Sequence, residues 1–157
     1  MSKKPYITKR GYQDLRAEYD ALWNQRRPQV VKALSAAAAE GDRSENAEYQ
    51  YRKKELREID RRVRYLQRRL PALEVVSQKP ADPGKVFFGA RVTLANPARQ
   101  QRCYRIVGSD ETDSAEENIS VDSPVARALL GRKVGDCVTV VLPQAEVEYE
   151  VLSIVYS

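Results

Sequence analysis

The feature that most restricts the fold of this chain is a heptad pattern of apolar residues near its middle. Apolar side chains recur there at alternating spacings of three and four residues, as in the buried seam of a coiled coil. The members of this seam are Leu56, Ile59, Val63, Leu66, Leu70 and Leu73. The pattern predicts a long helix that buries one narrow face against a second helix.

A matching helix is predicted closer to the N-terminus. Thr8 is a candidate N-cap, because its hydroxyl can accept a hydrogen bond from a free amide of the first turn. The apolar residues that follow at helical spacing are Tyr12, Leu15, Tyr19 and Leu22. Pro28 lacks an amide hydrogen and should kink this helix or shift its phase. Beyond it the apolar face should resume at Val31, Leu34 and Ala38.

The two seams are separated by a short segment around Gly41, which interrupts the helical pattern. A second helix is expected to begin near Ser44 and to fold back on the first as an antiparallel coiled-coil hairpin. With about 30 residues per arm, the hairpin would be roughly 45 Å long. A dimeric coiled coil is the competing interpretation, but a short turn between two seams of similar length favours pairing within one chain.

The pattern changes after the second helix, where Pro71, Pro80, Pro83 and Gly84 mark the helix exit and a linker. Short apolar runs separated by turn signals predict strands at residues 86–94, 101–107, 118–121, 137–142 and 147–155. One short helix should open at Ser123-Pro124 and end at Gly131. The expected fold class is α+β, with a coiled-coil hairpin at residues 1–77, a linker at 78–84 and a small antiparallel sheet domain with one short helix at 85–157.

Charge is divided unevenly between these parts. Residues 1–83 carry 19 basic and 12 acidic side chains, a net charge of +7, whereas residues 84–157 carry 8 and 10, a net charge of −2. The first part is therefore expected to meet a polyanion and the second to have another task.

Cellular location is predicted from what the sequence lacks. The chain begins MSKKP, without an apolar signal region, and no apolar run approaches the length needed to cross a bilayer. The two cysteines, Cys103 and Cys137, have no metal-type spacing, and we expect both to be buried thiols in strands. We therefore expect a cytoplasmic protein that does not associate with membranes.

The turn of the predicted hairpin places several carboxylates, in the run EGDRSENAE, at the end of an otherwise basic rod. Asp42 and Glu45 are three residues apart where the second helix should begin, so their side chains can converge on a shared divalent cation. Two carboxylates hold Mg²⁺ weakly, and its other ligands are usually water, substrate phosphates or another protein. A capping box, with Asp42 as N-cap and Glu45 at the third helical position, is the structural alternative.

The helix that follows is strongly basic, with nine basic residues against three acidic ones over residues 52–69. Four arginines at spacings of four, three and four form what we call the basic stripe, namely Arg57, Arg61, Arg64 and Arg68. Such a stripe can follow the phosphates of a single strand of nucleic acid without reading its sequence. The alternative is a solvated flank with salt bridges to the first arm. The candidate binding residues are the basic stripe together with Arg52, Lys53 and Lys54.

Three aromatic residues of the hairpin have more than one interpretation. Tyr49 and Tyr51 could stack on a base, although aromatic residues at helical spacing more often pack against a neighbouring helix. We expect one of them to pack and leave the other open. Trp23 lies beside Leu22 in the first seam, and we expect it in the core.

Four sequence runs resemble the Gre transcript-cleavage factors. Two lie in the hairpin, GDRSENAEYQY at residues 41–51 and LREIDRRVRYL at residues 56–66. The other two are GKVFFGA at residues 84–90 and ISVDSPVARALL at residues 119–130. The resemblance therefore covers nearly the whole chain.

This resemblance implies a hairpin that enters the secondary channel of bacterial RNA polymerase, and an FKBP-like domain that docks on the coiled coil at the channel rim. Asp42 and Glu45 match the family's catalytic acidic pair. The segment Asp122, Ser123 and Pro124 matches the polymerase-docking loop, where a turn with a proline at the first helical position is the structural alternative. The extended basic patch resembles the branch of the family that handles longer extruded RNA fragments.

The expected function is that of a transcription elongation factor that stimulates the polymerase's own cleavage of backtracked RNA and so rescues arrested complexes. The tip carboxylates would help retain a second Mg²⁺ and orient the attacking water, while the basic face holds the 3′ end of the RNA. The chain would be a monomer that binds Mg²⁺ only together with the polymerase. It would not cleave RNA alone.

Two other function classes remain open. A non-enzymatic regulator could use the same hairpin to block the channel, and cleavage with purified polymerase would distinguish it. A prolyl isomerase with a helical RNA- or ribosome-binding arm is suggested only by the FKBP-like part. The aromatic residues available to line an isomerase pocket there do not outline one clearly, and they are Phe87, Phe88, Tyr104 and Tyr149.

Overall fold

The computed structural model of this chain describes residues 5–41 and 45–156. Its fold is α+β, and it divides into two compact units. One unit is a helical hairpin of residues 12–72, and the other joins residues 5–11 to the sheet-containing part from residue 73 onward. No helix in the described ranges is both long enough and apolar enough to span a membrane.

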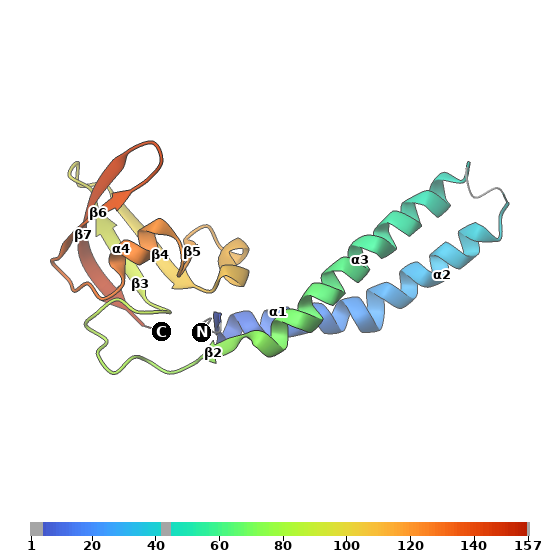
Figure 1. Cartoon of the computed structure of the whole chain (residues 1–157), viewed down its shortest axis with the longest axis horizontal. Helices are drawn as coiled ribbons and strands as arrows, with labels where there is room; N and C mark the ends of the chain where they lie inside the picture. Colours follow the sequence, from blue (N-terminus) through green and yellow to red (C-terminus); the bar gives the residue numbers. More distant parts are fainter. Residues whose placement is uncertain (1–4, 42–44, 157) are drawn as a thin grey trace. The chain divides into compact units, whose positions relative to one another are not determined.

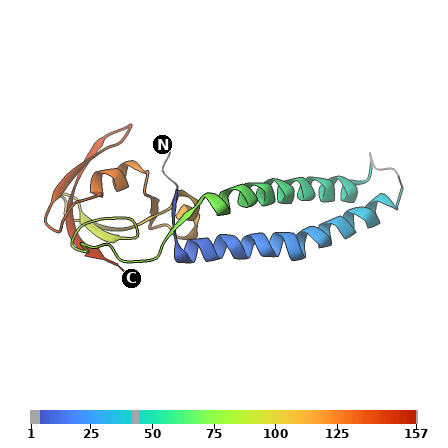
Figure 2. The same cartoon turned by 60° about the horizontal axis from the view of Figure 1, so that its bottom comes forward.

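The hairpin has one broken arm and one continuous arm. The first arm consists of α1 (Lys9–Ala21), a π-helical turn (Leu22–Arg26) and α2 (Arg27–Ala38), and the second arm is α3 (Ala47–Ala72). Figures 1 and 2 both show α3 lying alongside the first arm and running in the opposite direction. The predicted intramolecular hairpin is confirmed.

The buried seam of α3 is the one that the heptad pattern predicts, with Ile59, Val63, Leu66 and Leu70 all buried. At the level of α2, Val30 packs between Ile59 and Val63. Each large apolar side chain that leaves water in this way stabilises the hairpin by roughly 1.5–3 kcal/mol. The narrow seam leaves most of the surface of α3 in contact with solvent.

The first arm departs from prediction just before Pro28. In the π-helical turn the amide of Arg27 donates to the carbonyl of Leu22, five residues earlier, so the turn contains one extra residue. Pro28 follows in the first turn of α2. The phase shift expected at this proline is therefore present, in the form of a π turn.

The buried positions of α2 differ by one from those expected. Val30 and Ala37 are buried, whereas Val31, expected in the core, is 37% exposed. The expectation for Trp23 is also wrong, because its side chain is 45% exposed. The guanidinium of Arg27 lies over the Trp23 ring instead, 5.5 Å from its centroid.

The second unit is built on a five-stranded sheet with the strand order β5-β4-β3-β7-β6. Its strands are β3 (Arg91–Ala95), β4 (Gln101–Val107), β5 (Asn118–Ser120), β6 (Cys137–Val141) and β7 (Glu146–Val155). The neighbours are antiparallel except β4 and β5, which are parallel. The connection between β4 and β5 contains a six-residue 3₁₀ segment (Ser109–Ser114), and it is long enough for the chain to reverse and pair parallel.

The core of this sheet lies beneath the short helix α4 (Pro124–Leu129), which covers one face (Figure 1). Ala126 and Leu129 on the inner side of α4 are fully buried against the sheet. The predicted strand over residues 86–94 begins only at Arg91, because a turn with Gly89 at φ +89° precedes it. The cysteines are not the buried thiols that we expected, since Cys103 is only half-buried and Cys137 is exposed.

The sheet-containing unit has a second, small sheet, formed by the residues just before and just after the hairpin. In it β1 (Tyr6–Thr8) pairs parallel with β2 (Glu74–Val76). The buried carboxylate of Glu111 accepts hydrogen bonds from the Thr8 amide at 3.0 Å, the Gly108 amide at 2.8 Å and the Thr8 hydroxyl. The Thr8 hydroxyl in turn accepts from the Gly11 amide at 3.0 Å, which confirms Thr8 as the N-cap of α1.

We predict that Glu111→Ala destabilises the protein by about 3 kcal/mol, because it leaves buried amides without an acceptor. Thermal unfolding followed by circular dichroism measures the effect. Glu116→Ala, which removes an exposed carboxylate from the same connection, is the control and should leave Tm unchanged. Equal Tm values for the two variants would contradict this role of Glu111.

Candidate site at the hairpin tip and along the basic helix

The tip of the hairpin is partly described. Glu45 is exposed and lies before the first residue of α3. Gly41 has a φ of +129°, a backbone conformation that favours glycine, and open space surrounds the position that a Cβ would occupy. Asp42, the other member of the predicted acidic pair, lies outside the described residues, as does Ser44.

The start of α3 differs from the prediction. The helix begins at Ala47 rather than near Ser44, and Asn46 acts as its N-cap because its Oδ1 accepts from the Tyr49 amide at 3.0 Å. Glu45 therefore does not occupy the third position of this helix, as the capping-box alternative requires. Asn46 is a residue of the tip that the sequence interpretation missed, although asparagine is a favoured N-cap and stands directly before the helix.

Carboxylate oxygens are the ligands that Mg²⁺ prefers, and Glu45 offers such a group to solvent. Within the described ranges, no group of three or more Asp, Glu, Cys or His side chains is arranged to hold a metal ion. The donor chemistry at Glu45 fits Mg²⁺, but a metal held there would need further ligands.

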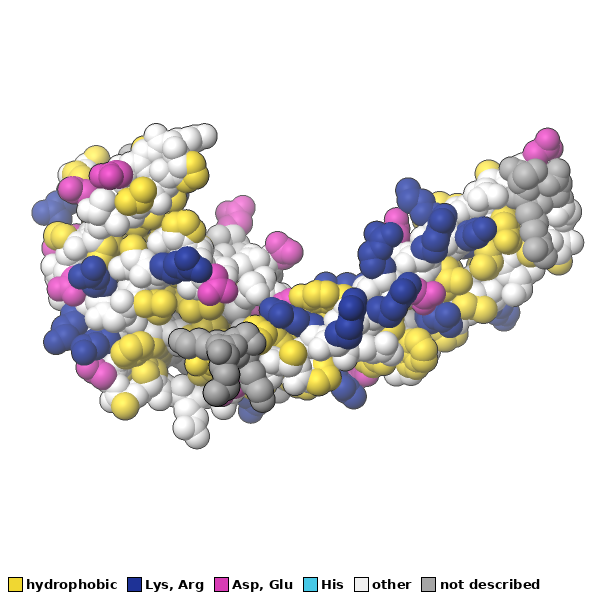
Figure 3. All heavy atoms as spheres, in the orientation of Figure 1, with side chains coloured by type: hydrophobic (Ala, Val, Ile, Leu, Met, Phe, Trp, Pro, Cys, Tyr) yellow, Lys and Arg dark blue, Asp and Glu magenta, His cyan; other side chains and the backbone are white. Residues whose placement is uncertain are grey.

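The basic stripe faces solvent along its whole length. Arg57, Arg61, Arg64 and Arg68 are all exposed, as are Lys53 and Lys54. Figure 3 shows Lys and Arg side chains gathered along the hairpin. In the described part of the chain, no carboxylate forms an ion pair with Arg57, Arg61 or Arg68. These guanidinium groups are available to a polyanion.

Other cations of α3 are held by neighbouring carboxylates instead. Arg62 binds Glu18 of α1 with two hydrogen bonds of 2.6 and 2.8 Å. Arg52 contacts both Glu55 and Glu48 at 2.9 Å, and its hydrogen bonds to these two carboxylates raise the pKa of its guanidinium. Of the predicted binding residues, Arg52 is therefore the one already paired within the hairpin.

The two tyrosines at the start of α3 differ in exposure. Tyr49 is half-buried, and the ammonium of Lys53 lies over its ring at 6.0 Å. Tyr51 is 59% exposed, with the guanidinium of Arg52 at 5.4 Å from its ring centroid. Tyr51 is thus the more exposed member of the pair, and Arg52 lies over one face of its ring.

The predicted docking loop precedes α4. The Ser123 hydroxyl accepts from the Ala126 amide at 3.2 Å, so Ser123 is the N-cap, and Pro124 occupies the first helical position. The Asp122 amide donates to the Ser120 hydroxyl at 3.1 Å, and the residue is exposed. Asp122 and Pro124, on either side of Ser123, are both exposed, as a contact surface requires.

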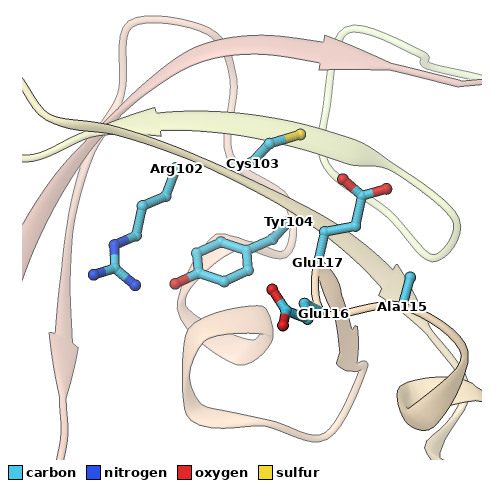
Figure 4. Close-up of a pocket in the computed structure, with 6 residues that line it drawn as sticks. All are labelled: Arg102, Cys103, Tyr104, Ala115, Glu116 and Glu117. Carbon is cyan, nitrogen blue, oxygen red and sulfur yellow. The ribbon is translucent and has the colours of Figure 1, made fainter.

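The sheet unit also contains an open hollow of ≈ 570 Å³ between β4 and the segment before β5 (Figure 4). Its lining residues are Arg102, Cys103, Tyr104, Ala115, Glu116 and Glu117. Tyr104 is the one aromatic side chain in this lining. Phe88 packs edge-on against Tyr6 instead, with ring centroids 5.5 Å apart. Tyr149 is partly buried elsewhere, and this burial raises the pKa of its hydroxyl. Phe87, Phe88 and Tyr149 do not line this hollow, in keeping with the expectation that these aromatic residues outline no clear isomerase pocket.

Both parts of the chain match models of one class of protein, the transcription elongation factors. The model described as "Transcription elongation factor, N-terminal" matches residues 5–75, and "Transcription elongation factor, GreA/GreB, C-term" matches residues 80–156. The chain belongs to the GreA/GreB family of transcription elongation factors.

Curated relatives named transcription elongation factor GreB match along almost their whole length. The one from Yersinia pestis is 55% identical over 99% of this chain and 91% of its own length, and the one from Xanthomonas axonopodis is 56% identical over 96% and 90%. Among solved structures, that of the transcription factor Gfh1 aligns over 98% of this chain and 99% of that chain, with 24% identity and a TM-score of 0.47.

We predict effects of different size on stability for two neighbouring arginines of α3. Arg62→Ala should lower the stability of the protein by about 1 kcal/mol, because it removes the two hydrogen bonds to Glu18. Arg61→Ala should change it by less than about 0.5 kcal/mol, since Arg61 is exposed. Thermal unfolding of the two variants measures the difference. A larger loss for Arg61→Ala would show that the basic stripe supports the fold.

Proposed function

We propose that this transcription elongation factor stimulates cleavage of backtracked RNA by bacterial RNA polymerase, acting through the polymerase secondary channel. The hairpin would carry Asp42 and Glu45 to the active site, and the polymerase would perform the hydrolysis. The observation that carries the proposal is the exposed Glu45 carboxylate, which lies outside α3 while Asn46 caps that helix. A carboxylate with no role in the helix start is free for chemistry.

In this proposal the tip supplies part of a shared metal site. Asp42 and Glu45 would hold one Mg²⁺ whose remaining ligands come from the polymerase and the RNA phosphate. Mg²⁺ bound there would supply positive charge that lowers the pKa of an attacking water and stabilises the transition state. The carboxylates of this chain would orient that water, and without the polymerase the pair would bind the ion only weakly.

The basic stripe supports a path for the extruded RNA. Its exposed guanidinium groups line the side of α3 that is turned away from the buried seam, where they can neutralise successive phosphates. Lys53 and Lys54 extend this surface toward the tip, and Tyr51 adds an exposed aromatic ring beside them. Docking would be a separate task of the loop Asp122, Ser123 and Pro124 at the channel rim.

A regulator that only blocks the channel is the second candidate, since an exposed hairpin could also occlude the channel without chemistry. A cleavage assay with purified polymerase distinguishes the two functions. A backtracked elongation complex with labelled RNA is incubated with and without the factor, and shortened RNA forms faster with the factor if it stimulates cleavage. A blocking protein would instead slow nucleotide addition and leave the RNA length unchanged.

We predict that Asp42→Asn and Glu45→Gln each abolish stimulated cleavage, with a loss of about 100-fold or more in rate, because each removes a charged metal ligand. Binding to the polymerase should be nearly unchanged, since neither residue belongs to the docking loop. Raised Mg²⁺ should partly restore the rate by mass action. Full cleavage by both variants would falsify the assigned role.

We also predict that replacing the four arginines of the basic stripe by alanine slows cleavage of long backtracked RNA more than of short RNA, because only a long 3′ segment reaches along α3. The salt dependence of the rate should become shallower, since fewer counterions are released. The measurement is cleavage rate against backtrack length at two salt concentrations. Circular dichroism checks that helicity is retained, because arginine stems also pack. An equal loss of cleavage rate at every backtrack length would show that the basic stripe does not bind the extruded RNA.

A further inference from the structure

The two helix ends at the hairpin tip have backbone groups that no helix can satisfy. The last carbonyls of α2 and the first amides of α3 lack partners within their own helices. One of these is the carbonyl of Ala37, whose residue is only 3% exposed. It accepts from the Glu40 amide, just beyond α2, at 3.2 Å, and as a carbonyl it can accept a second hydrogen bond. Another is the amide of Tyr49, in the first turn of α3.

A single side chain satisfies both groups. Asn46 donates from Nδ2 to the Ala37 carbonyl at 2.7 Å and accepts at Oδ1 from the Tyr49 amide at 3.0 Å. The main-chain carbonyl of Asn46 also accepts from the Gln50 amide at 3.1 Å, so the residue is fixed to α3 at its backbone as well. Asn46 thus ties the end of α2 to the start of α3.

This tie closes the tip at a defined place. Ala37 and Asn46 are nine positions apart in sequence, and the residues between them include the whole acidic turn. Closing a loop of this size costs conformational entropy, and a hydrogen bond across its base holds the two ends at one separation. Glu45 is covalently joined to Asn46, so the tie restricts where the Glu45 backbone can lie.

We propose that Asn46 is a positioning residue for cleavage, which holds the Glu45 carboxylate where the polymerase active site can use it. The proposal rests on the function proposed above. Positioning matters in such a reaction because a reacting group displaced by about 1 Å can cost up to about 100-fold in rate. Asn46 itself would touch neither RNA nor metal.

Asparagine has the chemistry that this double role requires. Its planar amide offers a donor and an acceptor on one short side chain. Serine and aspartate are about as good at an N-cap, so they can still accept from the Tyr49 amide. Aspartate has no hydrogen to donate, and the serine hydroxyl is too short to reach the Ala37 carbonyl as well. These two replacements therefore separate capping of α3 from the tie to α2.

The test uses the full-length variants Asn46→Ser and Asn46→Asp with the backtracked elongation complex. Two quantities are measured, the maximal cleavage rate at saturating factor and the factor concentration that gives half of it. Hydrogen exchange of the Tyr49 amide reports the cap, and Tm reports the fold. Glu18→Ala is the matched control, because it removes hydrogen bonds between the two arms far from the tip.

We expect both variants to lose about tenfold in maximal rate, with the half-saturating concentration, Tyr49 protection and Tm close to those of the parent protein. A shared loss in the neutral and the charged variant excludes a simple charge effect. Glu18→Ala should lower Tm and leave the maximal rate unchanged.

The proposal is overturned if both variants keep the parent maximal rate, or if their loss lies only in the half-saturating concentration or follows the Tm. Glu45→Gln in the same assay distinguishes this failure from failure of the proposed function. If Glu45→Gln is inactive while the Asn46 variants are fully active, only the positioning role is wrong. If Glu45→Gln also cleaves at the parent rate, the acidic tip is not catalytic and both proposals fail.

Discussion

Burial of one narrow apolar seam between the two arms is the constraint on which the hairpin depends. The seam of α3 is narrow, with buried residues from Ile59 to Leu70, and it packs against Val30, Tyr19 and Leu22 of the other arm. A seam of this kind stabilises the pairing of two helices while most of their surface stays exposed to solvent. Most charged side chains of α3 are therefore not needed to bury the seam, and they can serve to bind a partner. The exposed basic stripe lies on this solvent-exposed surface.

Features set by residues close together in sequence could be predicted, whereas those set by contacts between distant residues could not. The seam of α3 follows from local spacing, and it is buried at the predicted positions. The first arm was less predictable, because Pro28 indicates that the regular helix is interrupted but does not show how. A π turn precedes Pro28, Val30 is buried in place of Val31, and Trp23 is exposed. Only the packing partner across the hairpin decides between a kink and an inserted residue.

The sheet unit and the binding residues show the same division. Strand β4 has the predicted limits, since its apolar run and flanking turns are local signals. Glu111 was not identified, because its partner Thr8 is 103 positions away and a glutamate in a polar segment carries no sign of burial. Likewise, spacing places Arg61 and Arg62 side by side on a basic helix, but only the opposing Glu18 shows that Arg62 is engaged within the hairpin.

The tip illustrates how structural and chemical duties are divided between adjacent residues. An acidic residue at a helix start is normally explained by capping and by the helix dipole, and that explanation competes with any catalytic one. Here the Asn46 side chain accepts from the Tyr49 amide and donates to the Ala37 carbonyl, so neither group needs a bond to Glu45. A carboxylate that accepted from the Tyr49 amide would have an oxygen occupied and its charge partly neutralised. Because a neutral residue takes this role, Glu45 remains exposed, as the proposed metal-binding role requires.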